Sequence, residues 1–226
     1  MQRVASWNVI VPIKRLDAAK SRLMLGAAGH RERLALAFAR DVLSVALRAE
    51  NVGALFVVTD DEGISEIATR LGAQVVQEVT DPSKLAPDPL GGFPGLNAAI
   101  ELGSDFASAN GVDGGVAALA ADLPALRISE LEACLEAATH HPRAFTPDST
   151  GLGTSMLTAS ADVDLAPRFG QNSASRHRES GAFDLSEFSG AGLRLDVDTV
   201  DELGVALARG VGPFTALEIG TENLPR

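Results

Sequence analysis

Apolar runs alternate with helix-like segments over the first 80 residues, and this alternation constrains the fold more than any other feature. The run WNVIVPI, residues 7–13, is typical of a buried strand. Apolar residues then recur at helical spacing over residues 31–49. The next three segments are predicted to be a strand with a polar turn, a helix ended by Gly72, and a third strand: residues 53–61, 62–72 and 73–79. A β-α-β-α-β order predicts a mostly parallel sheet with helices on both faces.

The rest of the chain continues with elements of less regular length. Residues 80–94 contain four Pro and two Gly, which predicts a long loop, and long loops often carry function. A small apolar strand over 115–120 is expected at the centre of the sheet. Two helices flank it, at 95–109 and at 128–139, the latter capped by Ser129. Further predicted elements are short strands at 144–148, 153–159 and 193–199, and a helix at 199–209.

No linker composition separates the two halves of the chain. We therefore expect one α/β domain over residues 1–226 with a small α+β extension.

Composition and charge exclude several classes of partner. Nineteen Lys and Arg against thirty Asp and Glu give a formal net charge of −11, which argues against the basic face that a nucleic acid requires. No apolar run approaches the ~18 residues of a membrane span, so no membrane partner is expected. A lone Cys134 cannot form an internal disulfide and no leader pattern is visible, which favours a cytoplasmic protein. A small anion held by local positive charge remains open.

Carboxylates follow two of the predicted strands. Asp122 comes directly after the strand at 115–120, and Asp196 and Asp198 lie at the end of the strand expected at 193–199. Ligands of open α/β sheets bind at the carboxyl ends of strands, and Mg²⁺ takes one or two protein carboxylates beside phosphate oxygens and water. The alternative is that each aspartate caps the helix that follows it.

Basic and amide side chains suggest where a nucleotide could bind. Lys14, Arg15, Lys20 and Arg22 follow the first strand, where α/β proteins hold phosphates, although neither a P-loop nor a dinucleotide fingerprint is present. A solvated surface loop is the alternative. Asn97, in the first turn of a predicted helix, can read a base or ribose or can cap that helix.

Two small-residue stretches predict a second anion site. TGLGTSM contains Thr154 between glycines and a serine, and RFGQNSASRHRESGA places Gly170 and Ser173 among several cations. Arg168 and Arg176 suit planar capture of a carboxylate or phosphate. The alternative is a charged helix start, and His177 is assigned a surface or supporting role.

Taken in order, these stretches resemble the guanylyltransferases that activate a phosphorylated three-carbon acid in coenzyme F-420 biosynthesis, within the Rossmann-like molybdenum-cofactor-guanylyltransferase-like nucleotidyltransferases. The matching segments are VPIKRLDAAKSRL (11–23), VVTDD (57–61), GLNAAI (95–100), ADLPAL (121–126), GTSML (153–157), RFGQNSASRHRESGA (168–182) and LRLDVDT (193–199). The sixth segment resembles the branch that uses phosphoenolpyruvate. Two features depart from the family pattern, namely Ala121 in place of a usual glycine and a longer LGGFP segment.

The resemblance implies a nucleotide-binding part over about residues 1–140, an acceptor-binding extension over about residues 141–226, and a set of site residues and substrates. It implies Mg²⁺ on Asp122 and Asp196, and the phosphates of GTP near Lys14, Lys20 and Arg22, with Asn97 at the nucleotide. It also implies phosphoenolpyruvate at Thr154, Gly170 and Ser173, with Lys14 beside it, and catalytic roles for Asp122, Asp196 and Lys20.

The implied reaction joins phosphoenolpyruvate to GTP with loss of pyrophosphate, and the product passes to the next enzyme of the pathway. Alternatives are 2-phospho-L-lactate or a phosphoglycerate as the acceptor, a cytidylyl or molybdopterin transferase, and a non-catalytic nucleotide-binding subunit of the same fold.

Overall fold

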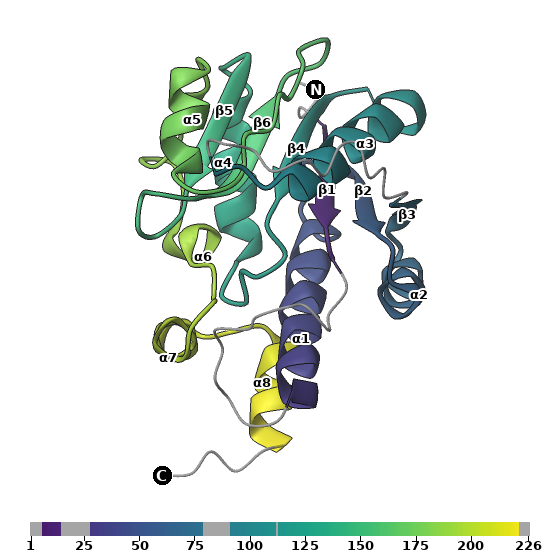
Figure 1. Ribbon diagram of the computed structural model, residues 1–226, viewed down its shortest axis with the longest axis vertical. Coiled ribbons are helices and arrows are strands. Elements are labelled where there is room, and N and C mark those ends of the chain that lie inside the picture. Colours follow the sequence, from purple (N-terminus) through teal and green to yellow (C-terminus); the bar gives the residue numbers. More distant parts are fainter. Residues whose placement is uncertain (1–5, 15–27, 79–90, 112, 222–226) are drawn as a thin grey trace.

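The computed structural model describes residues 6–14, 28–78, 91–111 and 113–221. The predicted phosphate ligands Lys20 and Arg22, and Arg15 beside them, lie outside these residues. The described chain alternates strands and helices as expected (Figure 1). The strands are β1 Trp7–Pro12, β2 Val52–Thr59, β3 Gln74–Gln77, β4 Gly115–Leu119, β5 Arg143–Pro147, β6 Thr154–Ala159 and β7 Phe183–Asp184. The helices are α1 Ala28–Ala46, α2 Glu62–Leu71, α3 Pro94–Asn110, α4 Ile128–Ala138, α5 Ser173–Glu179, α6 Ala191–Arg194, α7 Val200–Arg209 and α8 Pro213–Thr221.

The strands form one mixed sheet in the order β3-β2-β1-β4-β6-β5-β7. β1 pairs in parallel with β2 and β4, and β2 pairs in parallel with β3. β6 runs antiparallel between β4 and β5, and β7 is parallel to β5. The prediction of a mostly parallel sheet is confirmed, and β4 occupies the central place expected for it. Both predicted parts of the chain contribute strands to this sheet.

Helices cover both faces of the sheet, as the alternating pattern predicts. In β1, Val9 and Val11 pack with residues of α1, α2 and α4, whereas Ile10 points to the other face and packs with α3. α5 joins α3 on that second face through Ala174, which packs against Phe145 of β5. Because the helices cover the two faces, the ends of the strands are the part of the sheet that they leave uncovered.

Two elements differ from the sequence prediction. The strand expected at 193–199 is wrong, because Ala191–Arg194 form α6 and the next five residues belong to no strand. Leu193, Leu195 and Val197 alternate as in a strand and all three are buried, but Leu193 lies in α6 and the other two lie on irregular backbone.

The Ser129 cap is also wrong. Residue Arg127 precedes α4, and the Glu130 carboxylate accepts a hydrogen bond from its backbone amide at 3.2 Å. A reciprocal cap begins α7, where the Glu202 carboxylate also accepts from the Thr199 amide at 2.8 Å. The Thr199 hydroxyl accepts from the Glu202 amide at 3.3 Å, so neither Asp196 nor Asp198 caps that helix.

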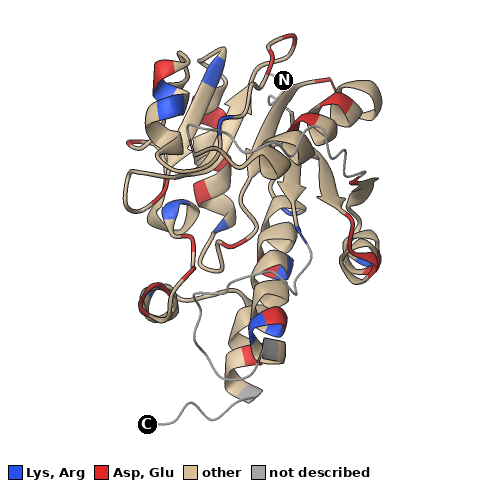
Figure 2. Ribbon diagram, in the orientation of Figure 1, with Lys and Arg blue, Asp and Glu red and all other residues tan. Residues whose placement is uncertain are grey.

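Charged side chains are dispersed over the fold. Figure 2 shows Lys and Arg residues interleaved with Asp and Glu over the described helices and strands. In the part of the chain that the structure describes, no helix combines the length and apolar character needed to cross a membrane.

Candidate active site

A cavity of about 430 Å³ lies at the strand ends, where the sheet is open. Its walls come from the loop after β1, one side of α1, the start of α3, the loop after β4, the β5–β6 turn, the segment that leads into α5 and the segment before α7. Because β6 is antiparallel, its first residue, Thr154, meets the carboxyl ends of β1 and β4 at the same edge. The position is the one where open α/β sheets bind ligands.

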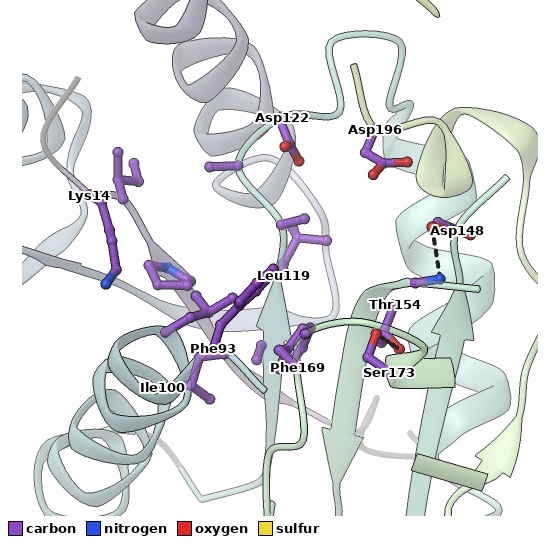
Figure 3. Close-up of a pocket in the computed structure, with 18 of the residues that line it drawn as sticks. Lys14, Phe93, Ile100, Leu119, Asp122, Asp148, Thr154, Phe169, Ser173 and Asp196 are labelled. Atoms are coloured by element: carbon purple, nitrogen blue, oxygen red, sulfur yellow. Dashed lines mark hydrogen bonds between the residues drawn. The ribbon is translucent and has the colours of Figure 1, made fainter. Parts of the chain in front are cut away.

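The cavity brings together most of the residues predicted for the site. Six of them line it: Lys14, Asp122, Thr154, Gly170, Ser173 and Asp196. Figure 3 shows Asp122 and Asp196 together along one part of the wall, Thr154 and Ser173 along another, and Lys14 on the far side from Asp196. Segments more than 180 residues apart therefore meet at one place.

A backbone hydrogen bond holds the two aspartate segments together. The Val197 amide donates to the Asp122 carbonyl at 3.0 Å, which places the loop after β4 against the segment before α7. Burial, and after it the neighbouring Asp122, Asp148 and Asp198 carboxylates, together raise the pKa of the Asp196 carboxyl to about 7. Clustered carboxylates of this kind are stabilised by a bound cation.

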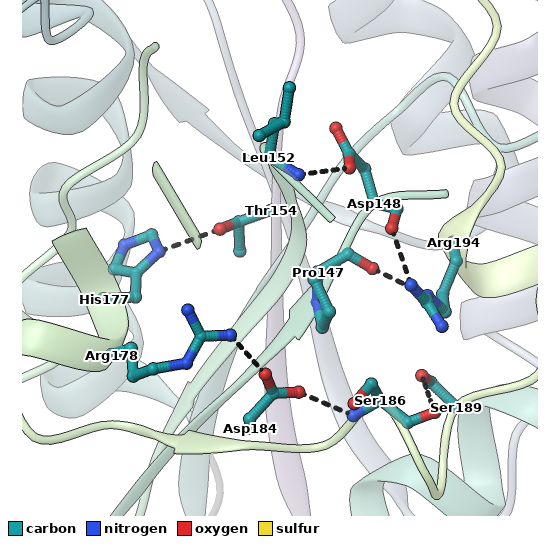
Figure 4. Close-up of polar contacts among 10 residues, drawn as sticks. All are labelled: Pro147, Asp148, Leu152, Thr154, His177, Arg178, Asp184, Ser186, Ser189 and Arg194. Carbon is teal, nitrogen blue, oxygen red and sulfur yellow. Dashed lines mark hydrogen bonds and ion pairs between the residues drawn. The ribbon is translucent and has the colours of Figure 1, made fainter. Parts of the chain in front are cut away.

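Sequence reasoning missed Asp148, which also lines the cavity. Its Oδ1 accepts a hydrogen bond from the Leu152 amide at 3.1 Å (Figure 4). Oδ1 also accepts from the Thr150 amide at 3.0 Å, and Oδ2 accepts from the Gly153 amide at 2.9 Å. The carboxylate therefore shapes the β5–β6 turn and sets the position of Thr154. The sequence carried a cue, because Asp followed by Ser, Thr and Gly is typical of an Asx-turn.

α6 is tied to the same turn by Arg194. Arg194 Nη2 donates to the Asp148 carbonyl at 2.9 Å, and Arg194 Nε donates to the Pro147 carbonyl at 3.1 Å (Figure 4). Since α6 leads directly to Asp196, this contact relates the aspartate pair to the turn that carries Thr154.

Thr154 lies at the centre of a hydrogen-bonded group. The Ser173 hydroxyl donates to Thr154 Oγ1 at 3.1 Å, and Nδ1 of His177 lies 2.9 Å from the same oxygen. His177 is fully buried, and its Nε2 accepts a hydrogen bond from the Arg168 amide at 2.9 Å. The supporting role predicted for His177 therefore fits the structure, whereas a surface position does not.

Gly170 is required by the close approach of two backbone segments. The Phe93 amide donates to the Phe169 carbonyl at 3.0 Å and the Gln171 amide donates to the Gly91 carbonyl at 2.9 Å. Gly170 has φ +134°, and a Cβ there would lie 2.5 Å from the Gly91 carbonyl oxygen. Only glycine fits both the conformation and the space.

Asn97 does not line the cavity. Its Oδ1 accepts from the Phe169 amide at 2.8 Å and its Nδ2 donates to the Phe169 carbonyl at 3.2 Å. Both polar groups of the side chain therefore hold the loop before α5, residues 168–172, which we call the acceptor loop after the ligand expected there. That Asn97 reads a base or ribose stays a prediction. The cap alternative is wrong, because α3 is preceded by Phe93 and Asn97 lies inside the helix.

The expected arginine cradle is not formed. Arg176 Nη2 donates to the Phe169 carbonyl at 2.9 Å, and neither Arg176 nor Arg168 is among the residues that line the cavity. The Arg176 guanidinium is instead a third donor to this carbonyl, beside the Phe93 amide and the Asn97 side chain.

Solved structures with a similar fold include a cytidylyltransferase. A cytidylyltransferase from Leptospira borgpetersenii superposes with a TM-score of 0.56 at 14% identity, covering 96% of this chain and 93% of that one. The Mycobacterium tuberculosis protein Rv0371c in complex with manganese gives a TM-score of 0.54 at 16% identity, covering 90% and 98%. At these identities the likeness shows the fold alone, and it confirms the expected nucleotidyltransferase architecture.

Sequence comparison gives the family. A phosphoenolpyruvate guanylyltransferase of Streptomyces coelicolor is 47% identical over 211 residues, covering 93% of this chain and 94% of that protein. A protein of the same name from Geodermatophilus obscurus is 45% identical over 231 residues, covering 100% and 99%. Residues 7–216 match the family described as "Guanylyl transferase CofC like". The chain belongs to the CofC-like guanylyl transferase family.

Proposed function

We propose that this protein transfers the guanylyl group of GTP to the phosphate of phosphoenolpyruvate, releasing pyrophosphate, in coenzyme F-420 biosynthesis. The observation that carries the proposal is the likeness, over nearly the whole chain, to proteins named phosphoenolpyruvate guanylyltransferase. The cavity supports it, because Thr154, Gly170 and Ser173, which the family resemblance assigns to the acceptor, line the same space as Asp122 and Asp196.

The donor set fits a hard divalent cation. Asp122 and Asp196 would hold Mg²⁺, and the raised pKa of Asp196 beside three other carboxylates is the property expected of a site that lacks a compensating positive charge. Among the described residues, no group of three or more His, Cys, Asp or Glu side chains could hold a metal alone. Substrate phosphates and water would complete an octahedral shell. When bound, the ion would supply positive charge beside the α-phosphate.

The chemistry needs orientation more than proton transfer. A phosphate monoester has a second pKa of about 6, so the acceptor is mostly ionised at neutral pH without a general base. An oxygen of that phosphate forms a bond to the α-phosphorus of GTP, and the bond from the α-phosphorus to the oxygen that bridges to the β-phosphate breaks. Pyrophosphate leaves with the electron pair, and the product is enolpyruvoyl-2-diphospho-5′-guanosine.

Each part of the cavity has a role in bringing two polyanions together. Thr154, Gly170 and Ser173 would hold the acceptor at one end, and Lys14 would neutralise phosphate charge at the other. The family resemblance adds Lys20 and Arg22 for the leaving pyrophosphate, and these two residues lie outside the described chain.

The experiment that tests the proposal compares acceptors and nucleotides. Purified protein with GTP and Mg²⁺ is supplied in turn with phosphoenolpyruvate, 2-phospho-L-lactate and 3-phosphoglycerate, and released pyrophosphate is measured. We expect phosphoenolpyruvate to give the highest kcat/KM, and CTP in place of GTP to give little product. Turnover with phospholactate but not with phosphoenolpyruvate would show that the acceptor has been misassigned.

A further inference from the structure

We propose that His177 is a positioning residue that fixes the Thr154 hydroxyl as a hydrogen-bond donor toward an anionic oxygen of the acceptor substrate. The inference rests on the proposed function, because it assigns Thr154 to the acceptor end of the cavity. It adds a residue that does not itself line the cavity, and it defines the kind of ligand atom to which the Thr154 hydroxyl can donate.

The protonated nitrogen of His177 follows from its partners. Nε2 lies 2.9 Å from the Arg168 backbone amide, which can only donate, so Nε2 must be the unprotonated acceptor. A neutral imidazole carries its one proton on the other nitrogen, which here is Nδ1. That proton points to Thr154 Oγ1 at 2.9 Å, so His177 is the donor of this hydrogen bond (Figure 4).

The hydroxyl of Thr154 is left with one function. A hydroxyl oxygen accepts two hydrogen bonds and donates one. Both acceptor positions of Thr154 are filled, one by His177 Nδ1 and one by the Ser173 hydroxyl at 3.1 Å. The hydroxyl of Thr154 can therefore take part in one more hydrogen bond only, as the donor. Because Thr154 lines the cavity, we expect the acceptor of that bond to be a ligand atom in the cavity. A ligand at this end must present an oxygen lone pair, as a carboxylate or phosphate does.

The surroundings keep the His177 ring neutral and in one orientation. Burial, and after it the positive charges of Arg143, Arg176 and Arg168, together lower the pKa of His177 to about 3. The ring lies edge-to-face with Phe169, with 5.1 Å between ring centroids. In a doubly protonated ring, the N–H at Nε2 would face the N–H of the Arg168 amide, and neither could accept. The hydrogen bond from Arg168 therefore requires a neutral His177 ring. The same ring links the acceptor loop, through the Arg168 amide, to β6.

Two isosteric variants separate the functions of the two ring nitrogens. His177→Asn keeps an amide donor near the position of Nδ1, whereas His177→Gln keeps an acceptor near Nε2 and loses the donor to Thr154. A hydrogen bond to a charged group contributes about 1.5–3 kcal/mol, which corresponds to roughly 10–100-fold in affinity. We expect His177→Gln to raise KM for phosphoenolpyruvate about 10-fold or more, with kcat and KM for GTP changed less than about threefold. His177→Asn should restore most of that loss.

A double-mutant cycle tests whether His177 acts through Thr154. Thr154→Val removes the donor and should raise KM for phosphoenolpyruvate roughly 10–100-fold, and adding His177→Gln should then raise KM no further. The exposed His140, changed to Gln, is the matched control and should leave all constants unchanged. Additive effects, or equal effects of the Asn and Gln variants on both substrates, would overturn the proposal and leave only a packing role.

A spectroscopic measurement on the unmodified protein keeps the proposal independent of variant folding and of the reaction. In a ¹⁵N-labelled sample at pH 7, long-range ¹⁵N–¹H correlation spectra should show His177 neutral, with Nδ1 protonated and Nε2 bare. A proton on Nε2, or on both nitrogens, would refute the donor assignment even if the enzyme turns over phosphoenolpyruvate. If the protein turns over no acceptor while the expected tautomer is found, the proposed function fails and the tautomer assignment stands.

Discussion

Gly170→Ala is expected to disrupt the acceptor loop through a backbone clash. The new Cβ would lie 2.5 Å from the Gly91 carbonyl oxygen and 2.6 Å from Gly92 Cα, and these backbone atoms cannot rotate away as a side chain can. The conformation at φ +134° costs a non-glycine residue about 1–3 kcal/mol. Overpacking adds about 1–3 kcal/mol more. Together the two costs destabilise the variant by about 2–6 kcal/mol. The clash can be relieved only if the acceptor loop moves away from residues 91–93.

Gly181→Ala is the matched control for this change. Gly181 also has a positive φ, +88°, but a Cβ there would have no atom within 4 Å, so it isolates conformational strain of about 1–2 kcal/mol. For a chain of this size each kcal/mol lowers Tm by about 2–4 °C. We expect Gly170→Ala to lower Tm more than Gly181→Ala does.

The kinetic result separates the two variants further. Displacing the acceptor by about 1 Å can cost about 100-fold in rate, so kcat/KM for phosphoenolpyruvate should fall by about that factor in Gly170→Ala and stay near the wild-type value in Gly181→Ala. Thermal unfolding and steady-state pyrophosphate release measure both quantities. Equal loss of Tm and equal kcat/KM in the two variants would refute the argument that the close approach at Gly170 positions the acceptor loop.

Three further predictions concern stability and reactivity. Asp41 is buried and accepts hydrogen bonds from the Phe214 and Thr215 amides at 3.0 and 2.9 Å, so Asp41→Ala should destabilise the protein by about 1–2 kcal/mol in chemical denaturation. The raised pKa of Asp196, about 7 against the usual 3.8, means that the folded state binds more protons between these values, so stability falls as pH rises through that window. In EDTA, Asp196→Asn should therefore raise Tm at pH 8 and raise it less at pH 5; an equal gain at both would contradict this reasoning. Burial raises the pKa of Cys134 to about 11, so the native thiol should resist a disulfide reagent at pH 8 and react after unfolding.

Regular elements could be predicted from the sequence because their physics is local. The apolar spacing of α1 and the short run of β4 each match a single periodicity, and Gly72 ends α2 in a left-handed conformation as expected. The segment at 193–199 shows where this reasoning fails. The apolar alternation that buries Leu193 and Val197 fits a strand of the sheet, and it fits equally a buried segment that joins no sheet. The sequence pattern alone does not distinguish these two backbone conformations.

The site could be predicted only for residues whose chemistry is visible in the sequence. Asp122 and Asp196 follow apolar segments and suggest an edge of the sheet, and the structure brings them together. The partners of Asn97 and His177 could not be found in this way. Asn97 bonds to a residue 72 positions away, and His177 reaches a threonine 23 positions away on a different element. Their roles depend on tertiary contacts that no local pattern encodes.

The most direct test of the central claim compares wild-type protein with Asp122→Asn. Both are supplied with GTP, phosphoenolpyruvate and saturating Mg²⁺, and pyrophosphate and the diphosphate product are measured. Loss of a carboxylate that holds the cation should remove several kcal/mol of transition-state stabilisation, so we expect turnover to fall about 1000-fold or more while Tm in EDTA is not lowered. Unchanged turnover in Asp122→Asn, or no product from the wild-type protein, would contradict the assignment of this cavity as the guanylyl-transfer site.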